Sequence, residues 1–298
     1  MKKIPQLMLA FGAAFVLQVA LAGLAHADFK IGVLAKRGAP QCMKKWGATA
    51  DYLSQKLGEK CTIIPLKFTA IEPAVTGKQI DFMLANSAFY VEMEKKHGVR
   101  AIATLINSRG GKALNEFGGV VFVRADSPIH TLADIKNKKF MCVKRSSFGG
   151  AHMAQRLLLE KGIDVTKDTA AFIEGGKHDN VVLAVLNGAV DAGTVRSDTL
   201  ERMHDEGKIK MSDFRVLNQV KDDFPFVHST RLYPEWPLAA LASTDKGLAD
   251  KVEAALIAMD KADPAAQAAK VVGWTAPADY KPVADCLRAI KYGAFAGE

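Results

Sequence analysis

Short apolar runs alternate with amphipathic segments along this 298-residue chain. The runs predict β-strands, and the segments whose apolar residues recur every three or four positions predict helices. An early example is the apolar run at 29–34, which is followed by a stripe of Trp46, Ala50, Leu53 and Leu57. Strands followed by helices in this way are typical of parallel sheets with helices on their faces.

The same periodicities predict an α/β fold throughout. Strands are expected at 29–34, 61–66, 79–84, 100–105, 118–124, 140–143, 169–172, 189–194, 214–220 and 238–243. Helices are expected at 43–57, 71–77, 88–97, 132–136, after Gly150, 180–187, 199–206, 248–260, after Pro264 and at 282–291. We expect two domains, with residues 28–125 and 226–298 forming domain 1 and residues 126–225 forming domain 2.

The N-terminus has the pattern of a secretory signal peptide. Lys2 and Lys3 precede an apolar run at 7–24, and a small-x-small sequence ends at Ala27. We therefore predict that residues 1–27 are a cleaved signal peptide and that the mature protein is periplasmic. A retained membrane anchor is the alternative, since the run is of marginal length for a membrane span.

Charge argues against a nucleic-acid partner. The chain has 40 Lys and Arg residues against 32 Asp and Glu residues, a formal net charge of +8. The predicted signal peptide contains two lysines and no acids, so its removal would leave about +6. The basic residues are spread along the chain, without the dense runs interleaved with aromatics that mark a nucleic-acid surface. A modest positive excess suits small anions.

Four cysteines remain in the predicted mature chain: Cys42, Cys61, Cys142 and Cys286. They permit three full disulfide pairings, which the sequence does not distinguish. The alternatives are a structural disulfide, burial as small apolar residues, or a thiol near the ligand. Because no CxxC or Cys/His spacing is present, we expect no metal site, and no motif predicts a cofactor.

One segment has the construction of an anion site. The strand predicted at 140–143 is followed by the turn 146–150, with Ser146, Ser147 and Gly149, and then by a helix. Such a turn directs backbone N–H groups and the positive end of the helix dipole toward an anion. The alternative is that a serine only caps the helix, because no complete phosphate-binding or dinucleotide fingerprint is present.

Other turns between strands and helices carry comparable groups. They are Lys36 with Arg37, the segment 87–90, and Arg196 with Ser197. Arg196 could bind an oxyanion in a bidentate manner or form an ion pair with Asp198 or Glu201. An enzyme would need a nucleophile with a positioned base. Although Ser147 and His178 could be imagined in those roles, the chain has no GxSxG elbow and no third orienting group, so no catalytic residue is predicted.

The mature chain resembles the periplasmic phosphate, phosphite and phosphonate-binding proteins of ABC transporters. The resemblance rests on the segments 86–93, 146–149 and 175–188. Segments 228–237 and 273–283 are more similar to the ligand-sensing domains of tetrathionate-type sensor histidine kinases, which share the fold. The resemblance implies an α/β, type II periplasmic binding-protein fold, with two β/α domains, a two-strand hinge and a ligand cleft between the domains.

The resemblance also implies a set of ligand contacts. The principal residues are Tyr90, Ser146, Ser147, Gly149, His178, Arg196 and Ser197. Further candidates are Lys36, Arg37, Thr69, Ser87, His228 and Ser229. This chain departs from the family pattern in two places: Phe148 replaces a hydroxyl residue, and Arg196 occupies the region where phosphonate binders use a carboxylate. A fully ionised phosphorus or sulfur oxyanion is therefore expected, and an aminophosphonate is not.

These observations lead to a functional expectation. The protein would be a monomeric solute-binding protein that captures a phosphonate, phosphite, phosphate or sulfur oxyanion such as tetrathionate for an ABC permease. The alternative is a stand-alone sensing subunit that reports to a membrane histidine kinase. Because no kinase or membrane-spanning sequence follows the binding region up to Glu298, a free-standing protein is expected. A hydrolase or transferase on the same fold is the weakest alternative.

Overall fold

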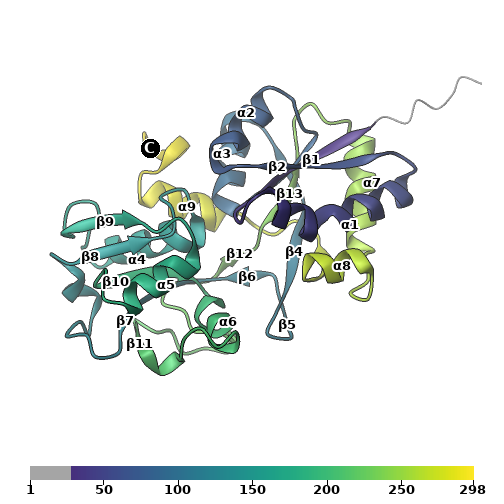
Figure 1. Cartoon of the computed structure of the whole chain (residues 1–298). Helices are drawn as coiled ribbons and strands as arrows, with labels where there is room; N and C mark the ends of the chain where they lie inside the picture. The colour runs from purple at the N-terminus through teal and green to yellow at the C-terminus, as the bar shows by residue number, and fades with distance from the viewer. Residues whose placement is uncertain (1–27) are drawn as a thin grey trace, which may run out of the picture.

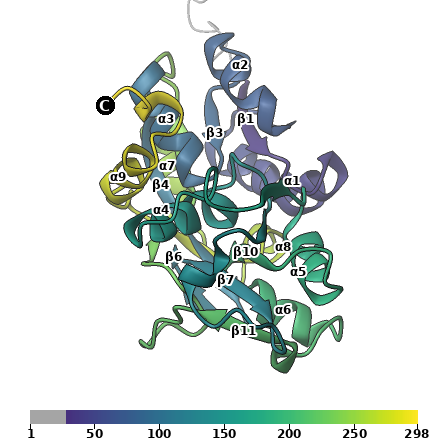
Figure 2. The same cartoon turned by 90° about the vertical axis from the view of Figure 1, so that its left-hand side faces the viewer.

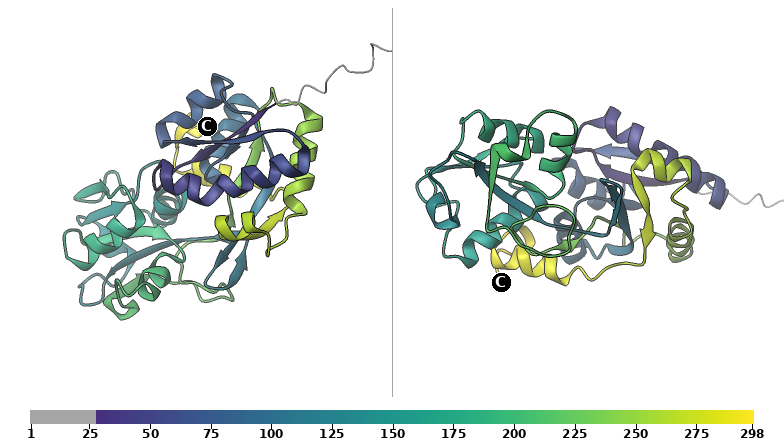
Figure 3. Two further views of the ribbon diagram at one scale, coloured as in Figure 1. Left: turned by 45° about the vertical axis from the view of Figure 1, so that its right-hand side comes forward. Right: turned by 90° about the horizontal axis from the view of Figure 1, so that it is seen from below.

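The computed structural model describes residues 28–298, so the predicted signal peptide lies outside the described residues. The described chain forms two lobes, each with a central sheet and helices on both sheet faces (Figure 1). The same two lobes can be seen from two further directions in Figure 3. Within residues 28–298, no helix combines the length and apolar character that crossing a membrane would require.

Domain 1 contains the larger sheet, in the order β2-β1-β3-β13-β4-β14, with β5 paired to β4. Its strands are β1 (Phe29–Leu34), β2 (Cys61–Leu66), β3 (Phe82–Leu84), β4 (Arg100–Arg109), β5 (Lys112–Leu114), β13 (Pro237–Ala240) and β14 (Val271–Thr275). Strand β1 is parallel to β2 and β3, whereas β13 lies antiparallel between β3 and β4. The expected parallel sheet is therefore a mixed sheet, because the chain returns from domain 2 in the opposite direction.

Two helical layers cover this sheet. One contains α1 (Ala39–Leu57), α7 (Lys246–Ile257) and α8 (Pro264–Ala269). The other contains α2 (Ile71–Thr76), α3 (Ser87–His97) and α9 (Lys281–Ala289). Their apolar stripes pack on opposite faces of the sheet and form two separate cores. This packing holds β1 and α1 in place and so positions the turn between them at one edge of the sheet.

Domain 2 contains a sheet in the order β9-β8-β10-β7-β11. Its strands are β7 (Gly119–Arg124), β8 (Lys139–Cys142), β9 (Ala171–Glu174), β10 (Ala192–Arg196) and β11 (Phe214–Leu217). Helix α4 (Met153–Glu160) covers one face, and α5 (His178–Leu186) and α6 (Thr199–Asp205) cover the other (Figure 2). In both domains an antiparallel strand from a distant part of the chain is inserted into the sheet.

The connection between the domains includes a pair of short strands. Strand β6 (Glu116–Phe117) pairs antiparallel with β12 (Tyr233–Pro234). Strand β7 lies in the second sheet, so the chain enters domain 2 before residue 119 and not at the expected boundary of 126. The return also comes later than expected, because Ser229 still hydrogen-bonds to strands β7 and β11 of domain 2. Helix α9 lies against both α3 and α4 and so adds a further contact between the domains (Figure 1).

Most predicted elements occur, with shifted ends. The strands at 29–34 and 61–66 match the prediction. Helix α1 begins at Ala39, four residues earlier than expected, because Pro40 occupies a first-turn position that does not need an N–H donor. The segment 132–135 is a 3-10 turn, and strand β14 was not predicted.

The four cysteines are buried and free, so the disulfide alternative is not present in this structure.

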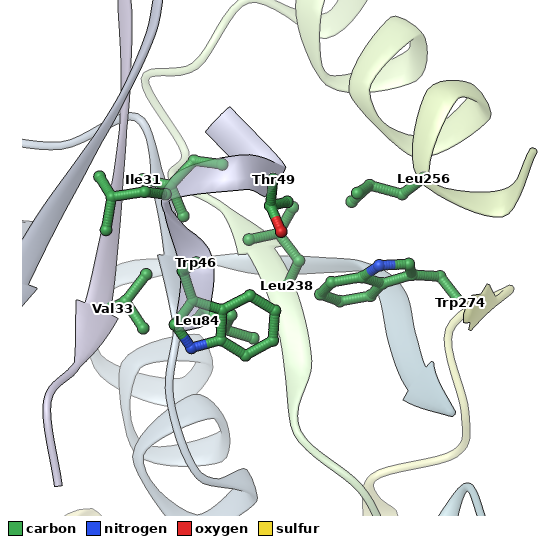
Figure 4. Close-up of a pocket in the computed structure, with 9 residues that line it drawn as sticks. Ile31, Val33, Trp46, Thr49, Leu84, Leu238, Leu256 and Trp274 are labelled. Atoms are coloured by element: carbon green, nitrogen blue, oxygen red, sulfur yellow. The ribbon is translucent and has the colours of Figure 1, made fainter. Parts of the chain in front are cut away.

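The core between α1 and the sheet also contains a cavity of about 10 Å³, which is about the size needed for one water molecule (Figure 4). Trp46, Thr49 and Trp274 are among the residues that line it. Within the described chain, Thr49 Oγ1 and Trp274 Nε1 have no hydrogen-bond partner.

Candidate functional site

A cluster of charged side chains lies where the two domains meet. Lys36 follows β1 and Arg109 ends β4 in domain 1, while Arg196 ends β10 in domain 2. Glu235 lies between β12, one of the two short strands that connect the domains, and β13, the strand by which the chain returns to domain 1. Because ends of strands from both sheets approach the domain junction here, the fold brings together groups that are distant in the sequence.

Arg196 is the central cation of this cluster. Its Nη2 donates to Glu235 Oε1 at 2.7 Å, and its Nε donates to Asp198 Oδ1 at 3.1 Å. The guanidinium carbon lies 4.2 Å from the centre of the Phe117 ring, a cation–π contact. Burial and the two carboxylates act on the pKa of Arg196 in opposite directions, and the carboxylates raise it above its usual value. Arg196 is therefore a fixed positive charge.

The two carboxylates are themselves enclosed. Glu235 is 0% exposed and Asp198 is 7% exposed. Burial acts to raise the pKa of Glu235, but Arg196 outweighs burial and holds the pKa below its usual value, so Glu235 is ionised. Asp198 has a left-handed backbone with φ of 74° and also lies 3.0 Å from Arg109 Nε. It therefore joins an arginine of each domain.

Two lysines supply the remaining positive charge. Lys36 Nζ lies 4.9 Å from the Trp236 ring centre, and Lys45 Nζ lies 4.7 Å from the Trp46 ring centre. Within residues 28–298, neither ammonium has a carboxylate oxygen within 4.0 Å. Lys36 remains exposed and Lys45 partly exposed, so a solute can reach this part of the cluster.

The surrounding protein disfavours the charged form of both lysines. Burial, followed by repulsion from Arg196 and Arg109, holds the pKa of Lys36 well below its usual value. Burial, followed by repulsion from Arg109, lowers the pKa of Lys45 to about 7. Each lysine has exposed surface although protein surrounds most of its ammonium group, and an anion bound there would relieve the repulsion.

His178 is the first residue of α5 and lies beside Arg196. The Arg196 backbone N–H donates to His178 Nδ1 at 3.3 Å. Burial, followed by repulsion from Lys36 and Arg196, holds the pKa of His178 well below its usual value. The ring is therefore neutral, and an accepting Nδ1 assigns the proton to Nε2, which can donate to an oxyanion.

The serine-rich turn enters a helix by an unusual geometry. Ser147 precedes a π-helical turn, Phe148–His152, which continues into α4. The Ser147 side chain makes no capping hydrogen bond, so the capping alternative is not observed at this residue. The first N–H groups of a helix have no partner within it and can bind an anion. A π-helical turn is often found at functional sites.

Contacts across the domain junction place this turn near domain 1. Asn86 Nδ2 donates to the carbonyl of Ser146 at 3.5 Å, and Arg37 Nη2 lies 3.8 Å from an Asp179 oxygen. A Cβ on Gly149 would lie 2.6 Å from the Phe117 ring and 3.0 Å from Arg196 Cβ. The turn, strand β6 and Arg196 therefore lie directly against one another. Arg37 lies at the exposed edge of the charged cluster.

The structure does not bring Tyr90 or Ser87 to the charged cluster. Tyr90 is 3% exposed, its hydroxyl donates to Glu94, and its ring packs on Tyr280. Ser87 is 0% exposed and donates to the carbonyl of Pro234 at 2.8 Å. Both side chains lie on the face of α3 that packs inward, so they stabilise domain 1.

Three further candidates hold the hinge region together. Ser197 Oγ accepts from the Gly118 N–H at 3.1 Å, and Ser229 Oγ donates to the Leu217 carbonyl at 2.7 Å. His228 is 2% exposed and its Nδ1 lies 2.7 Å from the Thr230 carbonyl. Thr69 is exposed, and no contact joins it to the cluster within the described chain. Backbone partners occupy the side chains of Ser197, His228 and Ser229, whose ligand contacts stay predictions.

Four charged residues of the cluster were not predicted as ligand contacts: Lys45, Arg109, Asp198 and Glu235. Glu235 lies within the segment 228–237, which the sequence had singled out by resemblance. Asp198 was considered only as an ion-pair partner of Arg196, and that pair is observed. Lys45 and Arg109 carry no local signal, because the polar side of a helix and the end of a strand commonly carry basic residues.

Comparison with solved structures defines the fold class. The chain is similar to XAC2383 from Xanthomonas citri bound to ATP, with a TM-score of 0.72, 18% identity, and coverage of 88% of this chain and 98% of that chain. It is also similar to PhnD1 from Prochlorococcus marinus (MIT 9301) in complex with methylphosphonate, with a TM-score of 0.68, 17% identity, and coverage of 87% and 97%. At these identities the likeness shows the fold alone. The predicted type II periplasmic binding-protein fold is confirmed.

The family follows from the sequence match. The model of the periplasmic substrate-binding protein of phosphonate ABC transporters matches residues 31–283, so the chain belongs to this family. The family is one of substrate-binding proteins.

One curated relative is a sensor histidine kinase. The chain is 33% identical over 265 residues to the tetrathionate sensor histidine kinase TtrS of Salmonella typhimurium. The match covers 88% of this chain and 44% of the kinase. The chain thus spans less than half the length of that relative.

Proposed function

We propose that the protein captures a small oxyanion between its two domains in the periplasm. The observation that carries this proposal is the position of Lys36 and Lys45 beside Arg196, with no carboxylate within 4.0 Å of either ammonium in the described chain. Basic side chains crowded together without a carboxylate partner favour an anionic ligand, which stabilises their charged form.

Hydrogen-bond donors near this cluster suit a phosphorus or sulfur oxyanion. His178 offers Nε2, Ser147 offers a hydroxyl without a capping partner, and the turn at 148–150 offers backbone N–H groups. The carboxylates of Glu235 and Asp198 are buried and already paired with arginine. They are thus poorly placed to accept an ammonium group, which argues against an aminophosphonate.

Ligand-stabilised closure is the signal we propose for the membrane partner. The contacts Arg37–Asp179 and Asn86–Ser146 join domain 1 to domain 2 in this structure. An anion bound between Lys36 and Arg196 would favour this closed arrangement over an open one. The partner would then recognise the closed arrangement.

A thermal-shift screen of residues 28–298 tests the proposal. The probes are phosphate, phosphite, methylphosphonate, sulfate, thiosulfate and tetrathionate, with glucose as an uncharged control. A ligand at 100 times its Kd adds about 2.7 kcal/mol to the free energy of unfolding, which raises Tm measurably. Lys36→Gln should remove the shift and Lys44→Gln, on the exposed side of α1, should keep it. A shift with glucose alone, or with no probe, would contradict the proposal.

Two kinds of membrane partner are compatible with the same binding event. Family membership favours an ABC permease, and the 33% identity to a tetrathionate sensor kinase favours a histidine kinase. We propose the permease as the first candidate because the family model covers residues 31–283. Deletion of the gene should then abolish uptake of the bound oxyanion. Normal uptake with loss of oxyanion-dependent transcription would instead assign the protein to sensing.

A further inference from the structure

The charges of the cluster divide into a paired set and an unpaired set. Arg196 contacts Glu235 and Asp198, and Arg109 contacts Asp198. These two cations and two anions balance one another. The balanced set supplies little net charge for a ligand.

The unpaired set consists of Lys36 and Lys45. Each ammonium lies against a tryptophan ring, and neither has a carboxylate within 4.0 Å in residues 28–298. The two lysines repel one another as well as the nearby arginines. A ligand with two negative charges would neutralise both ammonium groups, whereas a monoanion would leave one without a counter-charge.

We propose that this site selects dianions and that it takes up protons from solution as a dianion binds. The proposal deepens the proposed function, on which it rests. It names the ligand class by charge and makes binding dependent on pH.

The charges around each lysine determine the direction of this effect. Arg109, Arg196 and Arg37 repel Lys45, whereas Glu235 attracts it. Lys36 is repelled by Arg196, Arg109 and Lys45 and attracted by Asp198. Neutral His178 faces the same groups without adding charge.

Bound dianion would outweigh this repulsion and restore the ammonium form of both lysines. The pKa of Lys45 is about 7 in the free protein, so the lysine is largely neutral above that pH. A pKa that rises on binding means that binding takes up a proton between the free and bound pKa values. Affinity should therefore fall about tenfold per pH unit above about pH 7 through Lys45, and protonation of Lys36 should add to this fall.

Isothermal titration of residues 28–298 tests the inference. Titrations near pH 9, where phosphate, phosphite, methylphosphonate, sulfate, thiosulfate and tetrathionate are all dianions, keep the probe's own charge constant. The binding enthalpy of each probe that binds is compared in two buffers with different ionisation enthalpies. Proton uptake by the protein makes the two enthalpies differ in proportion to the protons taken up.

Matched variants assign the protons. Lys45→Gln should reduce the proton uptake and flatten the pH dependence of the Kd, whereas Lys44→Gln should leave both as in the parent protein. Nitrate, a monoanion, should bind at least tenfold more weakly than the dianion. Binding of a dianion with equal enthalpies in both buffers, or equal affinity for nitrate, would overturn the inference and leave the proposed function intact. Failure of all six probes to bind at any pH from 6 to 9 would overturn both.

Discussion

Arg196 and Glu235 form a buried ion pair of 2.7 Å between the end of a domain 2 strand and the segment that returns to domain 1. The Glu235 side chain is 1% exposed and the Arg196 side chain 9%. The pair thus joins the end of strand β10 to the segment between β12 and β13. It fixes Arg196 against Phe117, whose ring also lies close to Gly149 of the turn at 146–150.

Glu235→Gln should destabilise the protein, because it leaves the buried Arg196 without its closest counter-charge. Removal of one partner of a buried pair costs about 3–5 kcal/mol. Urea unfolding at neutral pH measures the change in the free energy of unfolding. The double variant Arg196→Gln with Glu235→Gln should lose less than the sum of the two single variants. A Glu235→Gln protein as stable as the parent would show that the pair contributes little.

Ser147→Ala should weaken anion binding and leave stability nearly unchanged. The Ser147 hydroxyl makes no capping hydrogen bond, so its loss should change the free energy of unfolding by less than about 0.5 kcal/mol. Loss of one hydrogen bond to the anion should cost about 0.5–1.5 kcal/mol, up to roughly tenfold in Kd.

Ser54→Ala is the matched control. Ser54 Oγ donates to the Ala50 carbonyl at 2.7 Å and accepts from the Cys61 N–H at 2.9 Å. This variant should reduce stability and preserve the Kd. If Ser147→Ala gave the pattern expected of Ser54→Ala, the hydroxyl would be structural.

Gly149→Ala should both destabilise the protein and weaken anion binding. The added methyl group would lie 2.6 Å from the Phe117 ring, so the ring that supports Arg196 must move. Overpacking of this kind costs about 1–3 kcal/mol. Gly47→Ala is the control, because its methyl group meets no atom within 4 Å and improves helix propensity. It should stabilise the protein by about 0.5–1 kcal/mol, and thermal unfolding compares the two.

His152 should make stability depend on pH. The ring is 0% exposed, and burial lowers its pKa to about 4 from an ordinary value of 6.5. The unfolded chain therefore binds a proton that the folded chain resists between these two values. Stability contributed by neutral His152 is complete above about pH 6.5 and falls by about 3 kcal/mol as the pH drops to about 4.

His152→Leu should remove this part of the pH dependence, as measured by urea unfolding from pH 7 to pH 4. The exposed His130→Leu serves as the control and should retain it. The centres of the His152 and Tyr292 rings lie 4.1 Å apart, near the contact between α4 and α9. Equal pH profiles for His152→Leu and the parent protein would show that other groups determine acid stability.

Local patterns predicted the elements better than their arrangement. The strands at 29–34 and 61–66 were predicted with correct ends because each is a continuous apolar run between polar turns. The antiparallel direction of β13 and the pairing of β14 depend on distant strands, and no local pattern encodes them. The domain boundary was misplaced for the same reason, since only pairing assigns β7 to the second sheet.

The site could be predicted only in part. Lys36, His178 and Arg196 lie at turns between strands and helices, and the structure places them near one another. Arg109 and Asp198 are 89 residues apart, so their contact follows from the fold and not from a motif. Tyr90 shows the opposite case: its position in the chain resembled a ligand contact, whereas helix α3 directs its side chain into the core.

The N-terminal prediction has its own simple test. We propose that residues 1–27 direct export and are removed after Ala27. Mass spectrometry of the protein purified from the periplasm should then give a mature chain that begins at Asp28. A full-length chain in the membrane fraction would instead indicate a retained anchor.

The central claim is that a small oxyanion binds between the domains at the cluster of Lys36, Lys45 and Arg196. A crystal structure of residues 28–298 with the oxyanion that gives the largest thermal shift tests it most directly. The account predicts density for the anion between the lysines and the turn at 146–150, within hydrogen-bond distance of His178 Nε2 or the Ser147 hydroxyl. Density for the anion elsewhere on the protein, with an empty cluster, would contradict it.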